Sequence, residues 1–263
     1  MRVFALQYHD VIEPGAADAS GAPGEDAATY KLPRALFEAH VSAVSRVARA
    51  GPPVLPPSDG ERTADGVVLF TFDDGGVSAA TATAGILERH AWRGIFLVTT
   101  DWIGRRGFLD EGQLRELDAR GHVIGAHSCS HPLRFSRCTP EQMRAEWRGS
   151  VRRLEDVLGH AVQVASVPGG YYSRAAAVTA AEAGIRTLFT SEPVARTERI
   201  DGCVVVGRFT LRAWSSPAVA AALAAGRPAP RAAQWLVWNS KKAVKSVWGD
   251  GYLRLRGQLL GGA

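Results

Sequence analysis

Two neighbouring carboxylates, Asp73 and Asp74, directly follow VVLFTF, a run of apolar and β-favouring residues at positions 67–72. Like charges that lie side by side at the end of a buried strand repel each other, and burial disfavours their ionised forms. A divalent cation would remove this repulsion if one carboxylate bound it and the other stayed free beside a metal-bound water. A free carboxylate in that position is a general base. The pair therefore indicates a metal site with a base beside it.

Two histidines supply further metal ligands. His127 and His131 lie four residues apart in GAHSCSHP, after another apolar run. A single helical turn that starts at the strand end would bring both imidazoles to one face, where they could share a metal ion. With one carboxylate they form a two-His, one-Asp set, which leaves coordination positions open for water and substrate. The alternative is two ordinary surface histidines on a loop, and the nearby carboxylates weaken it.

A regular alternation of strands and helices must position these residues. We expect strands at 3–8, 67–72, 94–99, 122–126, 164–167, 187–190 and 204–209, and helices around 36–47, 78–90, 110–120, 140–158 and 174–183. Apolar strands without polar alternation are typical of a parallel sheet covered by helices, here closed or nearly closed into an α/β barrel. In such barrels the chemistry lies on loops that follow the strands. His9, the carboxylate pair, His127 and the PGGYYS turn should therefore share one rim.

Composition limits the class of protein. The chain has 263 residues, of which 46% are hydrophobic, enough for one barrel domain, which we place at 1–230 with a C-terminal extension at 231–263. The net charge of +5 comes without a continuous basic stripe, so we do not expect nucleic-acid binding. Three cysteines without CxxC spacing favour a reducing compartment, and no apolar run suits a signal peptide or a membrane span. We expect a cytoplasmic protein.

The sequence TFDDG at 71–75, together with HSCSH at 127–131, resembles the first two motifs of the polysaccharide deacetylase family. This family is the NodB-homology domain of carbohydrate esterase family four. The resemblance implies an irregular (β/α)7 barrel in which Asp73 is the catalytic base. It also implies one divalent metal ion, usually zinc, although cobalt, nickel or iron would accept the same ligands.

The remaining roles in these two motifs follow from the same resemblance. Asp74, His127 and His131 would be the protein ligands of the metal ion. Ser128, inside the second motif, would support the site by hydrogen bonding. The expected substrate is an N-acetylated glycan.

The third family motif is only partly present. The family pattern is Arg-x-Pro-aromatic-Gly, and this chain has SVPGG at 166–170. The proline and the final glycine are kept as Pro168 and Gly170, whereas Ser166 and Gly169 stand at the arginine and aromatic positions. A backbone N–H near Gly169 could still donate to an oxyanion, since that function needs no side chain.

The arginine of this motif normally orients the catalytic base, so its role here is vacant or filled from elsewhere in the chain. Arg208, in the predicted strand at 204–209, is a candidate substitute. Two aromatic residues near strand ends, Trp102 and Tyr171, could stack on a sugar ring, with ordinary packing as the alternative.

Family members usually end with a strand of the form Leu-x-His-Asp, whose histidine protonates the leaving amine. This chain has no histidine after His160, but it begins with FALQYHD at 4–10. This segment resembles the same element moved to the N-terminus, as in the circularly permuted biofilm poly-N-acetylglucosamine deacetylases. The first and last strands of a closed barrel are neighbours, so permutation would leave the histidine in place. The resemblance implies that His9 is the general acid; the alternative is that it only caps a strand.

The C-terminal segment at 231–263 mixes tryptophans such as Trp235 and Trp238 with lysines such as Lys241. This composition is typical of a basic amphipathic helix at a membrane surface, here the inner membrane, and equally of a helix packed across the barrel. Membrane contact would suit a substrate still attached to a lipid carrier.

These observations predict a metal-dependent N-deacetylase that releases acetate from N-acetylhexosamine residues of a bacterial exopolysaccharide or of its lipid-linked precursor. Two alternatives stay open. Histidines and carboxylates also suit a phosphoesterase, although such sites often hold two metals. The missing motif arginine also permits an inactive glycan-binding relative.

Overall fold

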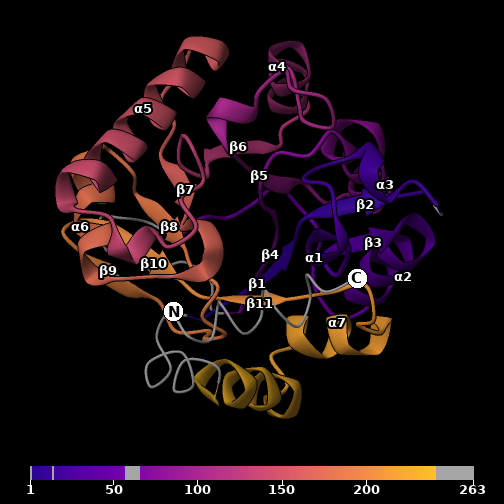
Figure 1. Cartoon of the computed structure of the whole chain (residues 1–263). Helices are drawn as coiled ribbons and strands as arrows, with labels where there is room; N and C mark the ends of the chain where they lie inside the picture. Colours follow the sequence, from indigo (N-terminus) through magenta and orange to yellow (C-terminus); the bar gives the residue numbers. More distant parts are fainter. Residues whose placement is uncertain (1, 14, 57–65, 241–263) are drawn as a thin grey trace, which may run out of the picture.

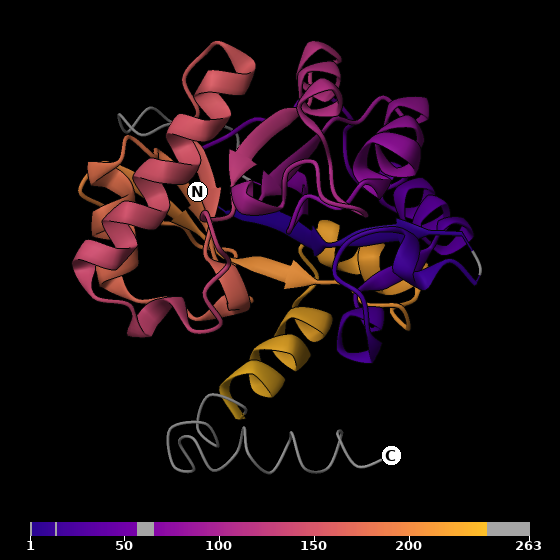
Figure 2. The same cartoon turned by 45° about the horizontal axis from the view of Figure 1, so that its top comes forward.

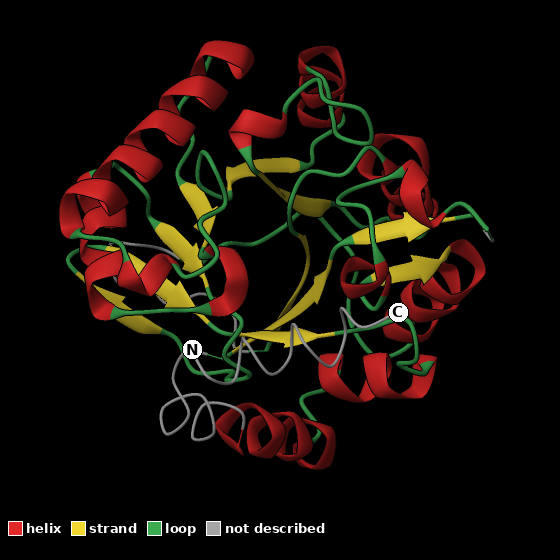
Figure 3. Cartoon of the chain, viewed as in Figure 1, coloured by secondary structure: helices red, strands yellow, loops and turns green. Residues whose placement is uncertain are grey.

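The computed structural model describes residues 2–13, 15–56 and 66–240, in which a curled sheet is surrounded by helices (Figures 1 and 3). In spatial order the strands are β11 (Arg208–Thr210), β1 (Val3–Tyr8), β4 (Val67–Phe72), β5 (Gly94–Val98), β6 (Val123–Ala126), β7 (Val164–Ser166), β8 (Thr187–Phe189), β10 (Cys203–Val206) and β9 (Glu198–Ile200). All neighbours pair in parallel except β9 and β10. The expected α/β barrel architecture is confirmed.

Hydrogen bonds outside the strand pairing draw the two ends of the curled sheet together. Two carbonyl groups in the segment after β8 accept hydrogen bonds from these ends. The Arg208 N–H of β11 donates to the Glu192 carbonyl (2.9 Å), and the Val3 N–H of β1 donates to the Ala195 carbonyl (2.8 Å). The two ends of the curled sheet are therefore joined through this segment.

The helices cover the outside of the sheet. They are α1 (Glu25–Ala28), α2 (Arg34–Ser45), α3 (Ala84–Arg89), preceded by the π-helical turn η2 (Ala79–Thr83), α4 (Glu111–Ala119), α5 (Pro140–Leu158), α6 (Arg174–Glu182) and α7 (Pro217–Ala224). Short 3-10 turns are η1 (Ala17–Ala19), η3 (Thr100–Trp102), η4 (Phe135–Arg137) and η5 (Pro168–Gly170). α5 begins as its sequence predicts, since Thr139 and Gln142 form a capping box, and it ends at Gly159 in the left-handed conformation.

Alternate side chains of each strand enter two different cores. Val3 and Ala5 of β1 face the barrel interior, whereas Phe4 and Leu6 pack in the larger core beneath the helices. The interior cluster consists of Val3, Ala5, Leu69, Ile95, Leu97, Val164, Phe189, Val204 and Val206. Each fully buried aliphatic or aromatic side chain contributes about 1.5–3 kcal/mol. Because both faces of the strands are covered, the strand sequences show no polar alternation.

The segment between β1 and α2, where the sequence predicts no strand or helix, contains a second small sheet of β2 (Asp10–Ile12) and β3 (Lys31–Pro33). Asp10 anchors it, because its buried carboxylate accepts hydrogen bonds from the hydroxyls of Ser20 and Ser78. Gly76 makes room for this carboxylate, since a Cβ at that position would lie 2.0 Å from an Asp10 oxygen. The anchored segment brings Tyr30 beside His9.

Residues 228–240 form a further helix, which begins three residues before the expected extension (Figure 2). One face packs on the barrel: the Gln234 amide donates to the Thr210 carbonyl (3.0 Å), and the Arg231 guanidinium lies 5.5 Å from the Phe4 ring centroid. These contacts agree with the alternative in which the C-terminal helix packs on the barrel. Outside these contacts, Trp235 and Leu236 are 49% and 61% exposed. The rest of the predicted extension, 241–263, lies outside the described residues.

We predict that Asp10→Ala destabilises the fold by about 2–3 kcal/mol, because the Ser20 and Ser78 hydroxyls lose a buried, charged acceptor. Urea unfolding at neutral pH measures the change. Asp156→Ala, at an exposed position of α5, is the matched control and should stay within about 0.5 kcal/mol of wild type. Equal stability of the two variants would contradict the anchoring role of Asp10.

Candidate active site

The parallel register places the ends of several strands at one rim of the barrel. The Asp73 N–H donates to the Tyr8 carbonyl of β1 (3.1 Å), and the His127 N–H donates to the Val98 carbonyl of β5 (2.8 Å). The pairing of Ala126 with Ala165 then sets Ser166 beside His127. The structure therefore brings together residues from β1, β4, β6 and β7, as the rim argument predicted.

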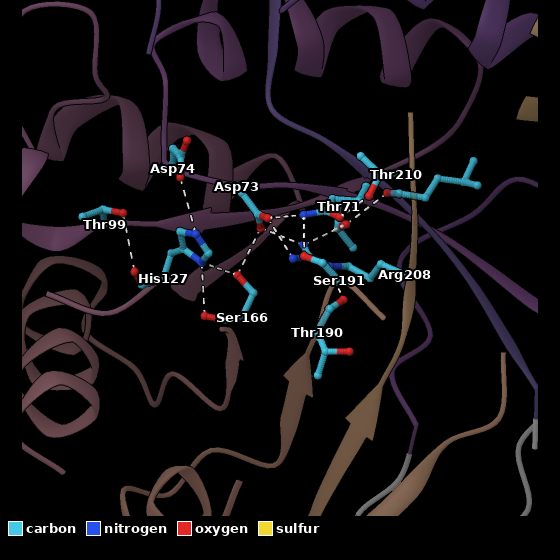
Figure 4. Close-up of polar contacts among 12 residues, drawn as sticks. Thr71, Asp73, Asp74, Thr99, His127, Ser166, Thr190, Ser191, Arg208 and Thr210 are labelled. Atoms are coloured by element: carbon cyan, nitrogen blue, oxygen red, sulfur yellow. Dashed lines mark hydrogen bonds and ion pairs between the residues drawn. The ribbon is translucent and has the colours of Figure 1, made fainter. Parts of the chain in front are cut away.

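The carboxylate of Asp73 lies inside the barrel and is held by three side chains (Figure 4). Arg208 donates to both oxygens at 2.7 Å. Gln7 donates to Oδ2 (2.7 Å), and the Ser166 hydroxyl donates to Oδ1 (3.1 Å). Burial alone would raise the pKa of Asp73, but the charge and hydrogen bonds of Arg208 outweigh it and hold that pKa well below its ordinary value. Asp73 is therefore an ionised, oriented carboxylate.

Arg208 reaches Asp73 from the opposite end of the sequence. Its side chain is fully buried, and its Nε donates to the Thr190 carbonyl (3.0 Å). In the register of β11 and β1, Arg208 pairs with Ala5, whose side chain faces the barrel interior. The geometry is that of a bidentate arginine–carboxylate pair. Arg208 thus lies where the family's motif arginine would have to act.

The hydrogen bonds of His127 fix which of its ring nitrogens carries the proton. Nδ1 faces the carbonyl oxygen of Ser166 (3.1 Å) and its hydroxyl (2.6 Å). A carbonyl only accepts, so we assign the proton to Nδ1. Burial lowers the pKa of His127 to about 3, so the ring is neutral. Its Nε2 lone pair is then free, and it points toward Asp74.

Three possible metal-ligand atoms, one from each of Asp74, His127 and His131, lie close together. Asp74 Oδ1 lies 3.4 Å from His127 Nε2 and 3.6 Å from His131 Nε2. This oxygen is buried and has no hydrogen-bond partner among the described residues, and burial raises the pKa of Asp74 to about 6. An unpartnered carboxylate oxygen facing two imidazole nitrogens is a donor set that suits a divalent cation such as zinc. The residues present therefore fit the metal ion that the family resemblance implies.

The two histidines meet by a different route from the expected helical turn, and that prediction was wrong. The segment after β6 is a loop in which Ser128 and His131 have positive φ angles of 65° and 55°. The Ser128 hydroxyl accepts from the His131 N–H (3.1 Å) and closes the loop. Asp74 is also left-handed, with φ 74°, which turns its side chain out of the strand alternation. Three left-handed residues therefore assemble the ligand set.

His9 lies beside the two carboxylates and outside the ligand cluster. Its ring centroid is 4.6 Å from that of Tyr30, and its Nδ1 is buried without a hydrogen-bond partner in the described part of the chain. In the register of β1 and β4, Tyr8 pairs with Phe72, which places His9 next to Asp73 at the ends of neighbouring strands. This placement is compatible with a proton donor at the rim.

The remaining predicted residues surround this centre. The Trp102 ring stacks on His131 with centroids 5.3 Å apart. Pro168 is buried in η5, where Gly169 has φ 64° and a Cβ at that position would lie 3.1 Å from the Leu133 carbonyl. Tyr171 lies against the guanidinium of Arg134. Contact of these residues with substrate stays a prediction.

Sequence reasoning missed two residues of the site, Gln7 and Ser166. Gln7 lies two positions before His9, and the period of two that puts Ala5 inside the barrel also turns Gln7 inward. Ser166 was noted only as a gap in the third motif. Its hydroxyl in fact joins His127 to Asp73, a link that no spacing in the sequence indicates.

We predict that Arg208→Gln destabilises the fold by about 3–5 kcal/mol, because it leaves the Asp73 carboxylate buried without its partner. Urea unfolding of both single variants and of the double variant Asp73→Asn/Arg208→Gln measures the coupling. The double variant should lose less than the sum of the single changes. Arg152→Gln, at an exposed position of α5, is the control for loss of a guanidinium. If the free-energy losses of the two single variants simply add in the double variant, the coupling between Asp73 and Arg208 is contradicted.

Known proteins resemble this chain in sequence and in fold. The family described as polysaccharide deacetylase matches residues 60–188. YxkH of Bacillus subtilis (strain 168), described as a candidate polysaccharide deacetylase, is 24% identical over 63% of this chain and 60% of its own length. The match thus spans less than two thirds of that relative.

Two solved structures show the same fold. A deacetylase of Streptococcus pyogenes, PplD in complex with acetate, is 19% identical, with a TM-score of 0.70 over 87% of this chain and 99% of its own. IcaB from Ammonifex degensii is 20% identical, with a TM-score of 0.66 over 85% and 97%. The region matched by the polysaccharide deacetylase family, residues 60–188, contains the two motifs that carry Asp73 and His127, and the chain is similar to that family in both sequence and fold.

Proposed function

We propose that this protein is a metal-dependent N-deacetylase that releases acetate from N-acetylhexosamine residues of a bacterial exopolysaccharide or its lipid-linked precursor. The observation that carries the proposal is the placement of an ionised carboxylate, Asp73, next to the convergent ligand atoms of Asp74, His127 and His131. The family match and a similar fold in a deacetylase solved with acetate support it.

Asp74, His127 and His131 would hold the metal ion. When bound, a divalent ion would supply Lewis acidity and lower the pKa of water, so that water could lose a proton near neutral pH. Asp73 would accept a proton from the attacking water. Its low pKa keeps it ionised at neutral pH, and Arg208 and Gln7 hold its oxygens in place.

The other residues of the rim complete the reaction. A backbone N–H of the turn at Gly169 would donate to the oxyanion, and His9 would protonate the departing amine. The amide C–N bond breaks, a water molecule is consumed, and acetate and an amino sugar are released. The position of β1 between β11 and β4 supports the proposal that β1 carries the general acid that other family members place on their final strand.

Two observations weigh against the alternatives. The described residues contain one group of side chains with metal-ligand spacing, whereas phosphoesterase sites of this kind often hold two ions. The inactive-relative alternative rested on the missing motif arginine. Arg208 contacts Asp73 and can orient it in place of that arginine.

We predict that Asp73→Asn lowers kcat for acetate release from N-acetylglucosamine oligomers by about 10²–10⁴-fold, because the general base is lost while the metal ligands remain. His127→Ala should lose both activity and bound metal, and chelator treatment of the wild type should abolish activity reversibly. Metal analysis of each variant accompanies the assay. Asp156→Asn, on the outside of α5, is the control; full activity of metal-free protein would contradict the proposal.

We also propose that the reaction takes place in the cytoplasm at the inner membrane surface, with the C-terminal helix as the contact. Support comes from the exposed side chains of Trp235, Leu236 and Val237 and from the lysines that follow in the sequence, including Lys241 and Lys242. The three cysteines are free thiols, as in a reducing compartment. Across the described residues, no helix has both the length and the apolar character needed to span a bilayer.

We predict that the wild type floats with vesicles that contain anionic lipid, and that the double variant Trp235→Ser/Leu236→Ser stays in the soluble fraction, because it lacks the apolar anchor. Val47→Ser removes an equally exposed apolar residue far from this helix in the sequence and should float like the wild type. Recovery of the wild type in the soluble fraction would remove membrane contact from the proposal.

A further inference from the structure

The guanidinium of Arg212, to which the proposed reaction gives no role, lies near two aromatic rings. Arg212 Cζ is 5.6 Å from the ring centroid of Tyr30 and 5.6 Å from that of Trp214. In residues 2–13, 15–56 and 66–240, no carboxylate forms an ion pair with Arg212, although many other arginines of the protein are paired. The charge of Arg212 is therefore available to a ligand.

This cluster runs from the rim toward the surface. Tyr30 is in ring contact with His9, with centroids 4.6 Å apart, and it shares Arg212 with Trp214. Trp214 is 66% exposed, which is unusual for so large an apolar side chain. The succession His9, Tyr30, Arg212 and Trp214 thus leads away from the side of the site where the leaving amine would be protonated.

The backbone fixes the cluster before any ligand arrives. The Ala213 N–H donates to the Thr29 carbonyl (3.1 Å), which ties the segment that carries Arg212 and Trp214 to the one that carries Tyr30. The Arg212 N–H donates to the Ser215 hydroxyl (3.0 Å), and the Ser215 N–H donates to the Arg212 carbonyl (2.8 Å), so the segment is a closed turn.

A buried histidine, His40, contacts the turn formed by residues 212–215. His40 Nε2 donates to the Ser215 carbonyl (2.7 Å), and the ring is fully buried in α2. Burial lowers the pKa of His40, so the ring is neutral and its Nδ1 is free to accept from the Tyr8 hydroxyl (3.3 Å). A turn anchored in the core orders its side chains at little further cost in entropy when a ligand binds.

We propose that Tyr30, Arg212 and Trp214 form a binding subsite for a part of the glycan that carries an anionic group, next to the sugar that loses its acetyl group. Aromatic faces offer apolar contact to a sugar ring, and a guanidinium binds carboxylate or phosphate oxygens in a bidentate manner. The anion is either the carboxylate of a sugar acid or a phosphate attached to the sugar. The subsite rests on the proposed function for its position relative to the reacting amide.

Binding to metal-free protein tests the subsite without turnover. Titration calorimetry would compare a hyaluronan tetrasaccharide with its carboxyl-reduced neutral form, and N-acetylglucosamine 1-phosphate with methyl N-acetylglucosaminide. We expect the anionic member of at least one pair to bind about tenfold or more tightly, the effect of one charge-assisted contact. Preference within the first pair identifies a sugar acid, and preference within the second identifies a phosphate.

Three variants assign the preference to this cluster. Arg212→Gln should abolish the charge preference, and Trp214→Ala should weaken both members of a pair alike, because it removes stacking and keeps the charge. Arg152→Gln, an exposed arginine on α5, should keep the wild-type preference. Thermal unfolding shows whether each variant is folded.

The outcomes separate the subsite from the reaction. Equal affinity of the wild type for the charged and neutral members of both pairs overturns the subsite, as does a preference that survives Arg212→Gln. Binding that depends on Arg212 without any acetate release keeps the subsite and contradicts the deacetylase function. Acetate release without charge preference removes only the subsite.

Discussion

The ion pair between Arg208 and Asp73 is the interaction on which the site depends. A carboxylate inside an apolar barrel would take up a proton, because burial disfavours its charge. The guanidinium, two hydrogen bonds at 2.7 Å and the amide of Gln7 reverse that tendency and keep Asp73 ionised. Such a pair adds little net stability compared with apolar residues, but the loss of one partner is costly. The pair therefore serves to keep Asp73 charged and oriented, and not to stabilise the fold.

One hydrogen-bonded network joins the candidate base to the candidate metal ligands. The Ser166 hydroxyl contacts both His127 and Asp73 (Figure 4). Together with the carbonyl of the same residue, it holds the proton on Nδ1 of His127 and leaves Nε2 bare, the usual function of a group behind a metal-ligating histidine. The position that carries arginine in the family motif is therefore reused: Ser166 contacts Asp73 through its hydroxyl, and Arg208 contacts the same carboxylate from β11.

The ligand set carries a conformational cost. Asp74, Ser128 and His131 are left-handed, and each such residue costs about 1 kcal/mol. The surrounding structure imposes these conformations, because Asp74 follows a buried strand and His131 is held through the hydroxyl of Ser128. Strain concentrated at three residues of one rim is typical of a functional site and not of a loop that only connects elements.

The sequence by itself predicted the barrel, the shared rim and the candidate metal ligands Asp74, His127 and His131. Apolar strands covered by helices leave few other architectures, and parallel strands bring their carboxyl ends to one edge. Local pattern could not predict the left-handed loop, the tie through Ser166 or the small sheet anchored by Asp10, because each depends on atoms far apart in the chain. The sequence offered Arg208 only as a candidate partner of Asp73, and the tertiary structure decided that this arginine makes the contact. Residues 135 positions apart become neighbours only when β11 pairs with β1, since long-range register, and not sequence spacing, fixes such contacts.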